Sequence, residues 1–417
     1  MRIVIFEDSI SDNFYPLSLT RPLWDLRMGL FTFAQRTARI AAKEFPDASI
    51  AYCGREELAG LCRELDPSAA YNDALFDDDV LYVNALFAPA TLGIESGTAL
   101  VRGGRLAIAR TSGDGAPRLH DAAWADSAGL KCAELGQDEV LIDHIWRIPL
   151  INGAMINRDF GLLESKGEQL LYNGVTFLGD PGRIHIGSNV TIDQCVVIDA
   201  RKGSVVIGDG AQIDPFTRIE GPCAIGENCV VLGAKMREGC SFGPSCRVGG
   251  EVEEAVFQAH SNKYHDGFIG HAYVGEWVNL GALTTNSDLK NDYSSVKLYR
   301  PGGIVDTGET KVGCLIGDFV KTSIGTLMNT GSVLATGSMT VMSGRMTPQH
   351  VPPFARFIKN ELRDPGSASP VIETAKTACS RRKKKLPAAM ESLLVRTYRE
   401  SAKVRKDESE QWNAALK

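Results

Sequence analysis

One stretch of the chain, residues 258–294, concentrates side chains that can do chemistry. It holds three of the seven histidines and two lysines, together with several asparagines: His260, His265, His271, Lys263 and Lys290. A histidine can exchange a proton near neutral pH, and lysine and asparagine side chains can hold a phosphorylated polar substrate. We therefore expect the chemistry of this chain to lie in this stretch.

The segments on both sides of the stretch carry a bulky apolar residue at every sixth position. Before it the positions are Ile186, Ile192, Ile198, Ile207, Ile213, Ile219, Ile225, Met236, Phe242 and Val248. After it the spacing returns at Ile316, Thr322, Met328 and Leu334. A period of six fits neither an α-helix nor an alternating strand. It predicts a solenoid of triangular coils, three hexapeptides per coil, with these residues pointing inward.

The first 160 residues alternate strand-like and helical patterns. Strands are expected at 2–6, 49–51 and 80–83 and a helix within 30–45, which predicts an α/β domain with a mainly parallel, Rossmann-like sheet. Ligands bind at the carboxyl ends of such strands. Arg21 and Arg27 lie in the loop after the first strand and would suit a phosphate; alternatively, they form salt bridges with Asp8 and Asp25.

Four segments are predicted: an α/β domain over 1–160, a linker helix over 161–173, the solenoid over 174–347 and a tail over 348–417. Prolines 352 and 353 are expected to stop further coils. One helical face in the tail is apolar and is predicted to cap the open end of the solenoid; its residues are Leu386, Met390, Leu393, Leu394 and Tyr398. The basic run 381–385 is interpreted as a solvated or phosphate-proximal patch.

The length and composition of the chain limit the classes of protein to which it can belong. With 417 residues we expect two or three domains. A net charge of −6 disfavours nucleic-acid binding, and no apolar run is long enough to span a membrane. The ten cysteines form no C-x-x-C pair. These features predict a cytoplasmic protein with neither nucleic-acid nor membrane partners.

Several motifs resemble one known family. Tyr15-Pro16-Leu17, Leu19-Thr20-Arg21-Pro22 and Tyr82-Val83-Asn84-Ala85 resemble sugar-nucleotidyltransferase-like domains fused to left-handed parallel β-helices. The segment 174–181 resembles the junction in the bifunctional N-acetylglucosamine-1-phosphate uridyltransferase/glucosamine-1-phosphate acetyltransferase family. The resemblance implies a homotrimeric enzyme of sugar-nucleotide biosynthesis. It would transfer acetyl from acetyl-CoA, bound between adjacent β-helices, to an amino-sugar 1-phosphate.

For the N-terminal domain, the resemblance implies nucleotidyl transfer between an NTP and a sugar 1-phosphate with Mg²⁺. The family's metal-binding aspartate is replaced here by Asn84, and the first loop has no glycine before Gly29. Two interpretations stay open. The site is rearranged, with Glu7 or Asp8 on the metal and Arg21, Arg27 and Asn84 near the nucleotide and phosphate, or it is degenerate.

For the β-helix, the resemblance implies a catalytic histidine fifteen residues before the aliphatic of an Asn-aliphatic-Gly-Ala turn. That turn is Asn279-Leu280-Gly281-Ala282, so the implied base is His265. The implied substrate-binding residues are Lys263, Asn279, Asn286, Lys290, Asn291 and Tyr293, with the amine contact open between Asn286 and Asn291. The implied acetyl-CoA contacts are Ala282, Lys321 and Thr322.

Other functions are weighed against this one. Either only the nucleotidyl step is active, or the chain is a non-catalytic oligomer that binds sugar nucleotides. A three-histidine zinc site like that of trimeric β-helix carbonic anhydrases needs a ligand from an earlier coil. No histidine lies between His185 and His260, which disfavours it.

Overall fold

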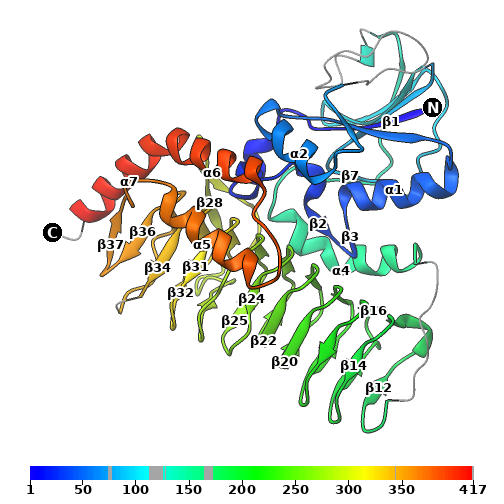
Figure 1. The fold of residues 1–417 in the computed structure, drawn as a ribbon. Coiled ribbons are helices and arrows are strands. Elements are labelled where there is room, and N and C mark those ends of the chain that lie inside the picture. Colours follow the sequence, from blue (N-terminus) through cyan, green and yellow to red (C-terminus); the bar gives the residue numbers. More distant parts are fainter. Residues whose placement is uncertain (74–77, 112–124, 127, 164–171, 343, 416–417) are drawn as a thin grey trace.

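The N-terminal apolar run forms an interior strand of the sheet in the first of two domains (Figure 1). The computed structural model describes residues 1–73, 78–111, 125–126, 128–163, 172–342 and 344–415. An α/β domain lies along one side of a long β-solenoid, and three C-terminal helices run back over the solenoid.

The α/β domain is built on a seven-stranded sheet of order β10-β8-β9-β6-β1-β4-β5. Its strands are β1 (Arg2–Phe6), β4 (Ser49–Cys53), β5 (Ala70–Tyr71), β6 (Val80–Asn84), β8 (Thr98–Arg102), β9 (Arg105–Thr111) and β10 (Lys131–Glu134). β1 pairs in parallel with both β4 and β6, and β9 is antiparallel to β6 and β8. The predicted strands and the mainly parallel sheet are confirmed.

Helices α1 (Phe33–Glu44), α2 (Ala59–Leu65) and α4 (Arg147–Phe160) complete this domain. α1 begins three residues later than the predicted segment, because Thr32 caps it: the Thr32 hydroxyl accepts from the Gln35 amide and the Gln35 side chain accepts from the Thr32 amide. Two short antiparallel pairs, β2 (Arg27–Met28) with β3 (Phe31–Thr32) and β7 (Phe87–Ala88) with β11 (Val140–Leu141), flank the sheet.

The solenoid has three faces of parallel strands. The docking face, against the α/β domain, contains β13 (Ile184–Ile186), β16 (Val205–Ile207), β19 (Cys223–Ile225), β21 (Cys240–Phe242), β23 (Val256–Phe257), β26 (Tyr273–Val274), β30 (Leu315–Ile316), β33 (Val333–Leu334) and β35 (His350–Val351). Helix α4 packs across β19, β21 and β23.

The second face, called the helix-covered face, contains β14 (Thr191–Ile192), β17 (Gln212–Ile213), the first halves of β20 (Val230–Met236) and β22 (Arg247–Glu253), β24 (Asn262–Lys263), β31 (Lys321–Thr322), β34 (Met339–Val341), β36 (Arg356–Ile358) and β37 (Glu361–Arg363). The third face contains β12 (Thr176–Leu178), β15 (Val197–Asp199), β18 (Arg218–Glu220), the second halves of β20 and β22, β25 (Phe268–Gly270), β27 (Thr285–Asn286) and β32 (Leu327–Met328).

The period of six is confirmed as the inward-facing period of the solenoid. All fourteen predicted inward residues are buried, and most are fully buried. Asn189 and Asn228 turn corners with φ of 54° and 53°, the left-handed conformation that asparagine tolerates better than most residues.

The end of the solenoid differs from the prediction. Coils continue past residue 347, because β35 and β36 still pair in parallel with β33 and β34. Prolines 352 and 353 lie in the turn between β35 and β36, outside any strand of the ladder, so the missing amides cost no strand pairing.

The tail forms helices α5 (Ser369–Ser380), α6 (Ala388–Glu400) and α7 (Ala402–Ala414). Most of the predicted apolar face lies on α6. It packs with α5, with α2 of the α/β domain and with Phe319 and Phe354 from coils near the solenoid end. That end is closed by β37 and α7, whose Trp412 packs edge-on against Phe357. The predicted linker helix 161–173 falls largely on 164–171, outside the described residues. None of the described helices is long and apolar enough to cross a membrane.

A buried ion-pair cluster joins the two domains. The guanidinium of Arg21, in the loop after β1, donates to both carboxylate oxygens of Asp318 in the solenoid at 3.0 Å, and it also contacts Asp25 and Glu276. Thr20 Oγ1 donates to the same Asp318 carboxylate at 2.6 Å. The side chains of Arg21 and Asp318 are 5% and 1% exposed, so this pair is removed from water.

Three further ties extend the interface along the docking face. The Arg27 amide donates to the Tyr273 hydroxyl at 2.8 Å. The Asn152 side chain of α4 donates to the Gly239 carbonyl at 2.8 Å. Tyr15 is hydrogen-bonded to His350 at 2.7 Å, and the other ring nitrogen of His350 contacts Glu408 of α7. The first loop is therefore anchored from the middle of the solenoid to its end.

We predict that Asp318→Ala lowers the free energy of unfolding by about 3 kcal/mol, because it leaves a buried guanidinium short of its main carboxylate partner. Chemical denaturation of the purified chain measures this change. Asp193→Asn, at an exposed solenoid carboxylate, is the matched control and should change stability by less than about 0.5 kcal/mol. Equal stability of the two variants would contradict the role given to this pair.

Candidate functional site

The three histidines of residues 258–294 have different surroundings. His260 stacks on Trp277, with ring centroids 4.3 Å apart, and its Nδ1 contacts Glu276 at 2.9 Å. His271 is buried between Glu254 and Asp288, each 2.8 Å away. Both occupy left-handed corners, with φ of 60° and 48°. Both imidazoles are hydrogen-bonded to carboxylates, which favours a structural role for them at the corners of the coils.

His265 lies on an exposed corner between the helix-covered face and the third face. Its imidazole makes no hydrogen bond or ion pair with any residue in the described part of the chain; its one ring contact is edge-on to Tyr264 at 5.9 Å. The corner is fixed by its backbone, since the carbonyl of His265 accepts from Lys263 Nζ at 2.6 Å and the carbonyl of Asp266 accepts from the Leu283 amide at 2.8 Å.

Two predicted substrate residues point into the solenoid instead of toward solvent. Lys263 pairs with Val248, an inward position, and its Nζ also donates to the Gly249 carbonyl at 2.9 Å. Burial lowers the pKa of Lys263 to about 8. Asn286 pairs with inward Met328 and exchanges hydrogen bonds with the amide and carbonyl of Gly270. This placement favours structural roles for both side chains.

Asn279 and Lys321 come together on the helix-covered face. Backbone bridges align Asn262, Asn279 and Lys321 in one column across consecutive coils. Lys321 Nζ donates to the Trp277 carbonyl at 2.5 Å, and burial lowers the pKa of Lys321 to about 8. These two predicted contacts therefore line one groove.

The remaining predicted residues are dispersed. Thr322 is buried, and its hydroxyl is used by the Gly281 amide and Thr284. Ala282 lies on the same solenoid edge as His265, one coil later, where its carbonyl accepts from the Gly325 amide. Lys290, Asn291 and Tyr293 occupy the loop before hairpin β28 (Lys297–Arg300) and β29 (Gly303–Asp306); Lys290 donates to the Ser295 carbonyl, and Tyr293 is 70% exposed.

A second polar cluster lies at the carboxyl ends of β1 and β6. Asp8 Oδ2 accepts from Asn84 Nδ2 at 2.9 Å and from Arg105 Nε at 2.8 Å. Asp8 Oδ1 and the second terminal nitrogen of Arg105 are buried without a hydrogen-bond partner. Such orphaned charged atoms are costly unless a ligand engages them, so this cluster is the candidate site of the α/β domain.

Arg21 and Arg27 are not part of this cluster. Arg21 is engaged by three carboxylates at the domain interface, including Asp25, which was one of the alternative salt-bridge partners. Arg27 is buried, and its side chain donates to the Leu30 carbonyl. The structure thus favours the salt-bridge interpretation for Arg21. The side chains of both arginines are engaged outside the Asp8 cluster.

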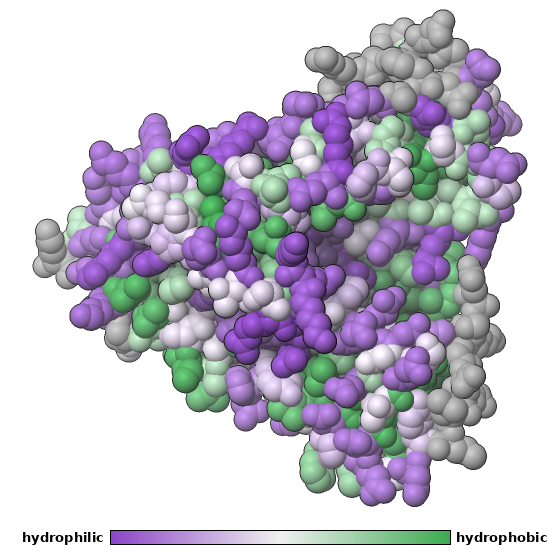
Figure 2. Space-filling model, in the orientation of Figure 1, coloured by the Kyte–Doolittle hydropathy of each residue, from purple (hydrophilic) through white to green (hydrophobic). Residues whose placement is uncertain are grey.

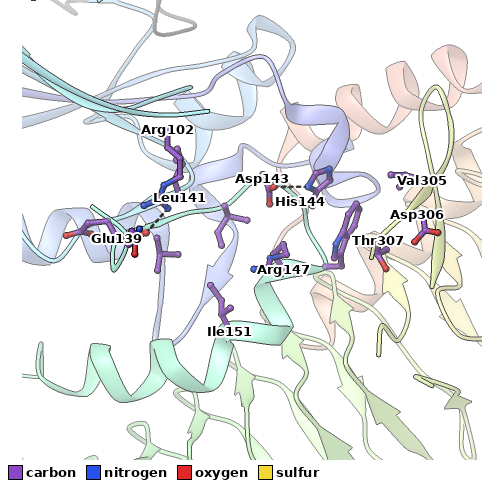
Figure 3. Close-up of a pocket in the computed structure, with 14 residues that line it drawn as sticks. Arg102, Glu139, Leu141, Asp143, His144, Arg147, Ile151, Val305, Asp306 and Thr307 are labelled. Carbon is purple, nitrogen blue, oxygen red and sulfur yellow. Dashed lines mark hydrogen bonds and ion pairs between the residues drawn. The ribbon is translucent and has the colours of Figure 1, made fainter. Parts of the chain in front are cut away.

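A cavity of about 530 Å³ opens near the Asp8 cluster, between residues 137–151 and the β28–β29 hairpin (Figure 3). Arg105 links the two, because it donates to Asp8 and also to the Ile142 carbonyl at 2.8 Å. Asp143 and His144 lie side by side in the cavity wall, 3.2 Å apart, and the hydrogen bond from His144 lowers the pKa of Asp143.

Arg105 was missed by reasoning from sequence, although a signal existed. It is a charged residue at the start of the apolar run Leu106-Ala107-Ile108-Ala109, and such a residue at a strand end can reach the edge of the sheet. Across the described residues, no group of three or more histidine, cysteine, aspartate or glutamate side chains is arranged to hold a metal ion. Asp8 Oδ1 is a buried carboxylate oxygen without a hydrogen-bond partner at this edge of the sheet.

Family models match two segments of the chain, one in each domain. Residues 3–168 match the model described as "Sugar nucleotidyl transferase". Residues 204–232 match "Bacterial transferase hexapeptide (six repeats)". The predicted fusion of a nucleotidyltransferase-like domain to a hexapeptide solenoid is confirmed.

Several curated proteins named "Bifunctional protein GlmU" are similar to part of the chain. The one from Azoarcus sp. (strain BH72) is 38% identical over 121 residues, 28% of this chain and 25% of that protein. The one from Rippkaea orientalis (strain PCC 8801 / RF-1) is 32% identical over 183 residues, 38% of each. The chain thus matches between a quarter and two fifths of the length of these relatives.

Among solved structures, a hexapeptide transferase family protein from Anaplasma phagocytophilum covers 57% of this chain and 90% of its own. The identity is 11% and the TM-score is 0.14. The family models and the coordinates themselves establish the architecture: a sugar nucleotidyl transferase domain docked on a hexapeptide solenoid.

We predict that His271 makes stability depend on pH. Burial opposes its charge, but the hydrogen bonds that His271 donates to Asp288 and Glu254 outweigh burial and raise the pKa of His271 from 6.5 to about 9. A raised folded-state pKa stabilises the fold fully below pH 6.5, and this contribution is lost as the pH rises through 9. The loss should reach up to about 3 kcal/mol.

Denaturation of the wild type and His271→Gln at pH 6 and pH 10 measures this effect. The difference in unfolding free energy between the two chains should shrink at the higher pH. A difference that stays constant with pH would show that His271 is not a buried, charged group.

Proposed function

We propose that this chain is a transferase of sugar-nucleotide biosynthesis whose solenoid transfers acetyl from acetyl-CoA to an amino-sugar 1-phosphate, with His265 as the base. One observation carries the proposal. Of the three histidines in residues 258–294, His265 is the one whose imidazole is exposed and free of any described hydrogen-bond or ion-pair partner. The similarity to proteins named "Bifunctional protein GlmU" supports this choice of activity.

The chemistry requires such a free imidazole. An amine that attacks a thioester must lose a proton, and a base with a pKa near 7 can accept it. The nitrogen then bonds to the acetyl carbonyl carbon, the thiolate of coenzyme A leaves, and the proton from His265 can return to that thiolate. His271 cannot accept this proton at pH 7, because its two carboxylates keep it protonated.

The edge that carries His265 also bears exposed apolar side chains at successive corners: Phe216, Leu232, Leu283, Ile324 and Val341, between 38% and 78% exposed. Apolar side chains reach the surface along the lower border of the solenoid in Figure 2. Covering these residues with another copy of the chain would stabilise the assembly. We therefore propose a homotrimer in which a neighbouring subunit completes the site at His265.

For the α/β domain we propose nucleotidyl transfer from an NTP to a sugar 1-phosphate. Support comes from the match of residues 3–168 to the sugar nucleotidyl transferase model and from the orphaned atoms of Asp8 and Arg105. Mg²⁺ commonly uses one or two carboxylates together with substrate phosphates, so Asp8 Oδ1 suits it. The ion would offset charge on the transferred phosphoryl group, while Arg105 would hold a phosphate oxygen and Asn84 would fix Asp8.

We place this activity in the cytoplasm. The ten cysteines are all free thiols in the structure, which suits a reducing compartment. Under this proposal Arg21 and Arg27 organise the domain interface rather than the nucleotide site.

We predict that His265→Ala lowers the rate of acetyl transfer to glucosamine 1-phosphate by about 10²–10⁴-fold, the usual contribution of a general base. Release of the coenzyme A thiol measures the rate. His185→Ala is the matched control, because it removes a histidine from β13, in the first coils of the solenoid.

Full activity of a folded His265→Ala chain would remove His265 from the mechanism. No acetyl transfer by the wild type, together with pyrophosphate release in the assay of the α/β domain below, would leave the nucleotidyl step as the function.

We predict that Asp8→Asn abolishes pyrophosphate release from an NTP and a sugar 1-phosphate in the presence of Mg²⁺, because the free carboxylate oxygen is lost. A phosphate-release assay coupled to pyrophosphatase measures this with a panel of NTPs. Asp12→Asn, at an exposed carboxylate of the same loop, should keep wild-type activity. Wild-type activity in Asp8→Asn would show that the cluster is not the nucleotidyl site.

A further inference from the structure

A cavity of about 550 Å³ lies between the helix-covered face of the solenoid and the chain's own C-terminal segment. The solenoid side contributes Arg247, Trp277, Asn279 and Lys321, and the end of α5 contributes Arg381 and Arg382. Volumes of this size are typical of small-molecule sites. Of the basic run noted in the sequence, Arg381 and Arg382 therefore line this groove, whereas Lys383, Lys384 and Lys385 are exposed outside it.

The charges around this cavity are unbalanced. One carboxylate and four basic side chains line the cavity. The carboxylate is Glu373, and the basic side chains are Arg247, Lys321, Arg381 and Arg382. Glu373 is itself paired with Lys376 at 3.5 Å. Within the described part of the chain, none of the three arginines has a carboxylate within ion-pair distance.

The cations converge from both walls. Arg247 pairs in register with Asn262, and the bridges through Asn262 continue the column to Asn279 and Lys321. From the opposite wall, Arg382 reaches across and donates to Asn262 Oδ1 at 2.7 Å. Burial, followed by repulsion from Arg247 and Arg381, lowers the pKa of Arg382. The fold thus holds like charges together at a cost in free energy.

The neighbouring carboxylates do not relieve this charge. Glu276 lies next to Trp277 in sequence, but its carboxylate contacts Arg21 and His260. Asp318 is taken up by Arg21, Thr20 and the Glu276 amide. A multivalent anion is therefore the natural partner of the cavity, because it would neutralise several guanidinium groups at once.

We propose that this cavity is a binding site for the phosphoanhydride group of a nucleotide, clamped between Arg247 on the solenoid and Arg381 and Arg382 after α5. The amides of Asn262 and Asn279 supply hydrogen bonds, and the Trp277–His260 stack supplies an aromatic wall. Such a group occurs both in coenzyme A and in the nucleotide of the α/β domain. The site does not depend on His265 acting as a base.

Calorimetric titration of the full chain with inorganic pyrophosphate, coenzyme A and UTP tests the proposal. Pyrophosphate should bind, and the affinity should fall as salt rises, as expected for an ionic site. Arg381→Gln/Arg382→Gln should weaken binding at least about tenfold. Lys384→Gln/Lys385→Gln removes the same charge from the same basic run at exposed positions outside the cavity, and it should weaken binding less than about threefold.

Arg247→Gln provides a second test that leaves the C-terminal segment intact, and it should weaken pyrophosphate binding to a similar extent. Competition with pyrophosphate by coenzyme A or by UTP then identifies the source of the phosphoanhydride, and either result supports the site. Equal loss in the arginine and lysine double variants would show a diffuse basic surface and overturn the proposal. So would the absence of binding by all three probes.

Discussion

The contact between Arg21 and Asp318 is the interaction on which the arrangement of this molecule depends. A guanidinium in the first loop of the α/β domain and a carboxylate in the solenoid are both withdrawn from water, and removing either would leave an uncompensated buried charge. Thr20 and Glu276 converge on the same pair. The two domains are consequently held as one unit. The loop after β1, which the sequence placed near a nucleotide, packs in the domain interface instead.

This docking connects the first loop of the α/β domain to the cationic cavity of the solenoid. Glu276 contacts Arg21 on one side and His260 on the other, and His260 stacks on Trp277 in the wall of the cationic cavity. A short chain of contacts therefore runs from the first loop of the α/β domain to the groove beneath α5. His265 lies on the same coils but at the outer corner, where the surrounding carboxylates do not reach its imidazole.

The periodic part of the fold could be predicted from sequence, because an inward aliphatic every six residues has one structural solution. The α/β strands were also predictable, since β1 and β6 are continuous apolar runs. The polar residues were harder. Lys263 and Asn286 occupy inward positions where the pattern alone would place an aliphatic, and their partners are backbone groups of neighbouring coils. The period of six does not identify these backbone partners.

Long-range packing accounts for the other differences. Arg21 contacts Asp318 across 297 residues, and the apolar face of α6 packs against α2 of the α/β domain as well as against the solenoid. Both contacts depend on how the two domains dock. Local sequence periodicity carries no information about that docking. The same holds for the cationic cavity, since Arg247 and Arg382 lie 135 positions apart in the sequence.

The central claim is that the first loop of the α/β domain is sealed against the solenoid and the two domains act as one body. Hydrogen exchange of the backbone amides of residues 20–27, followed by mass spectrometry on the full chain, tests it most directly. The account predicts protection comparable to that of β1, because these amides are buried and Arg21 is anchored on Asp318. Exchange as fast as that of an exposed loop would contradict it.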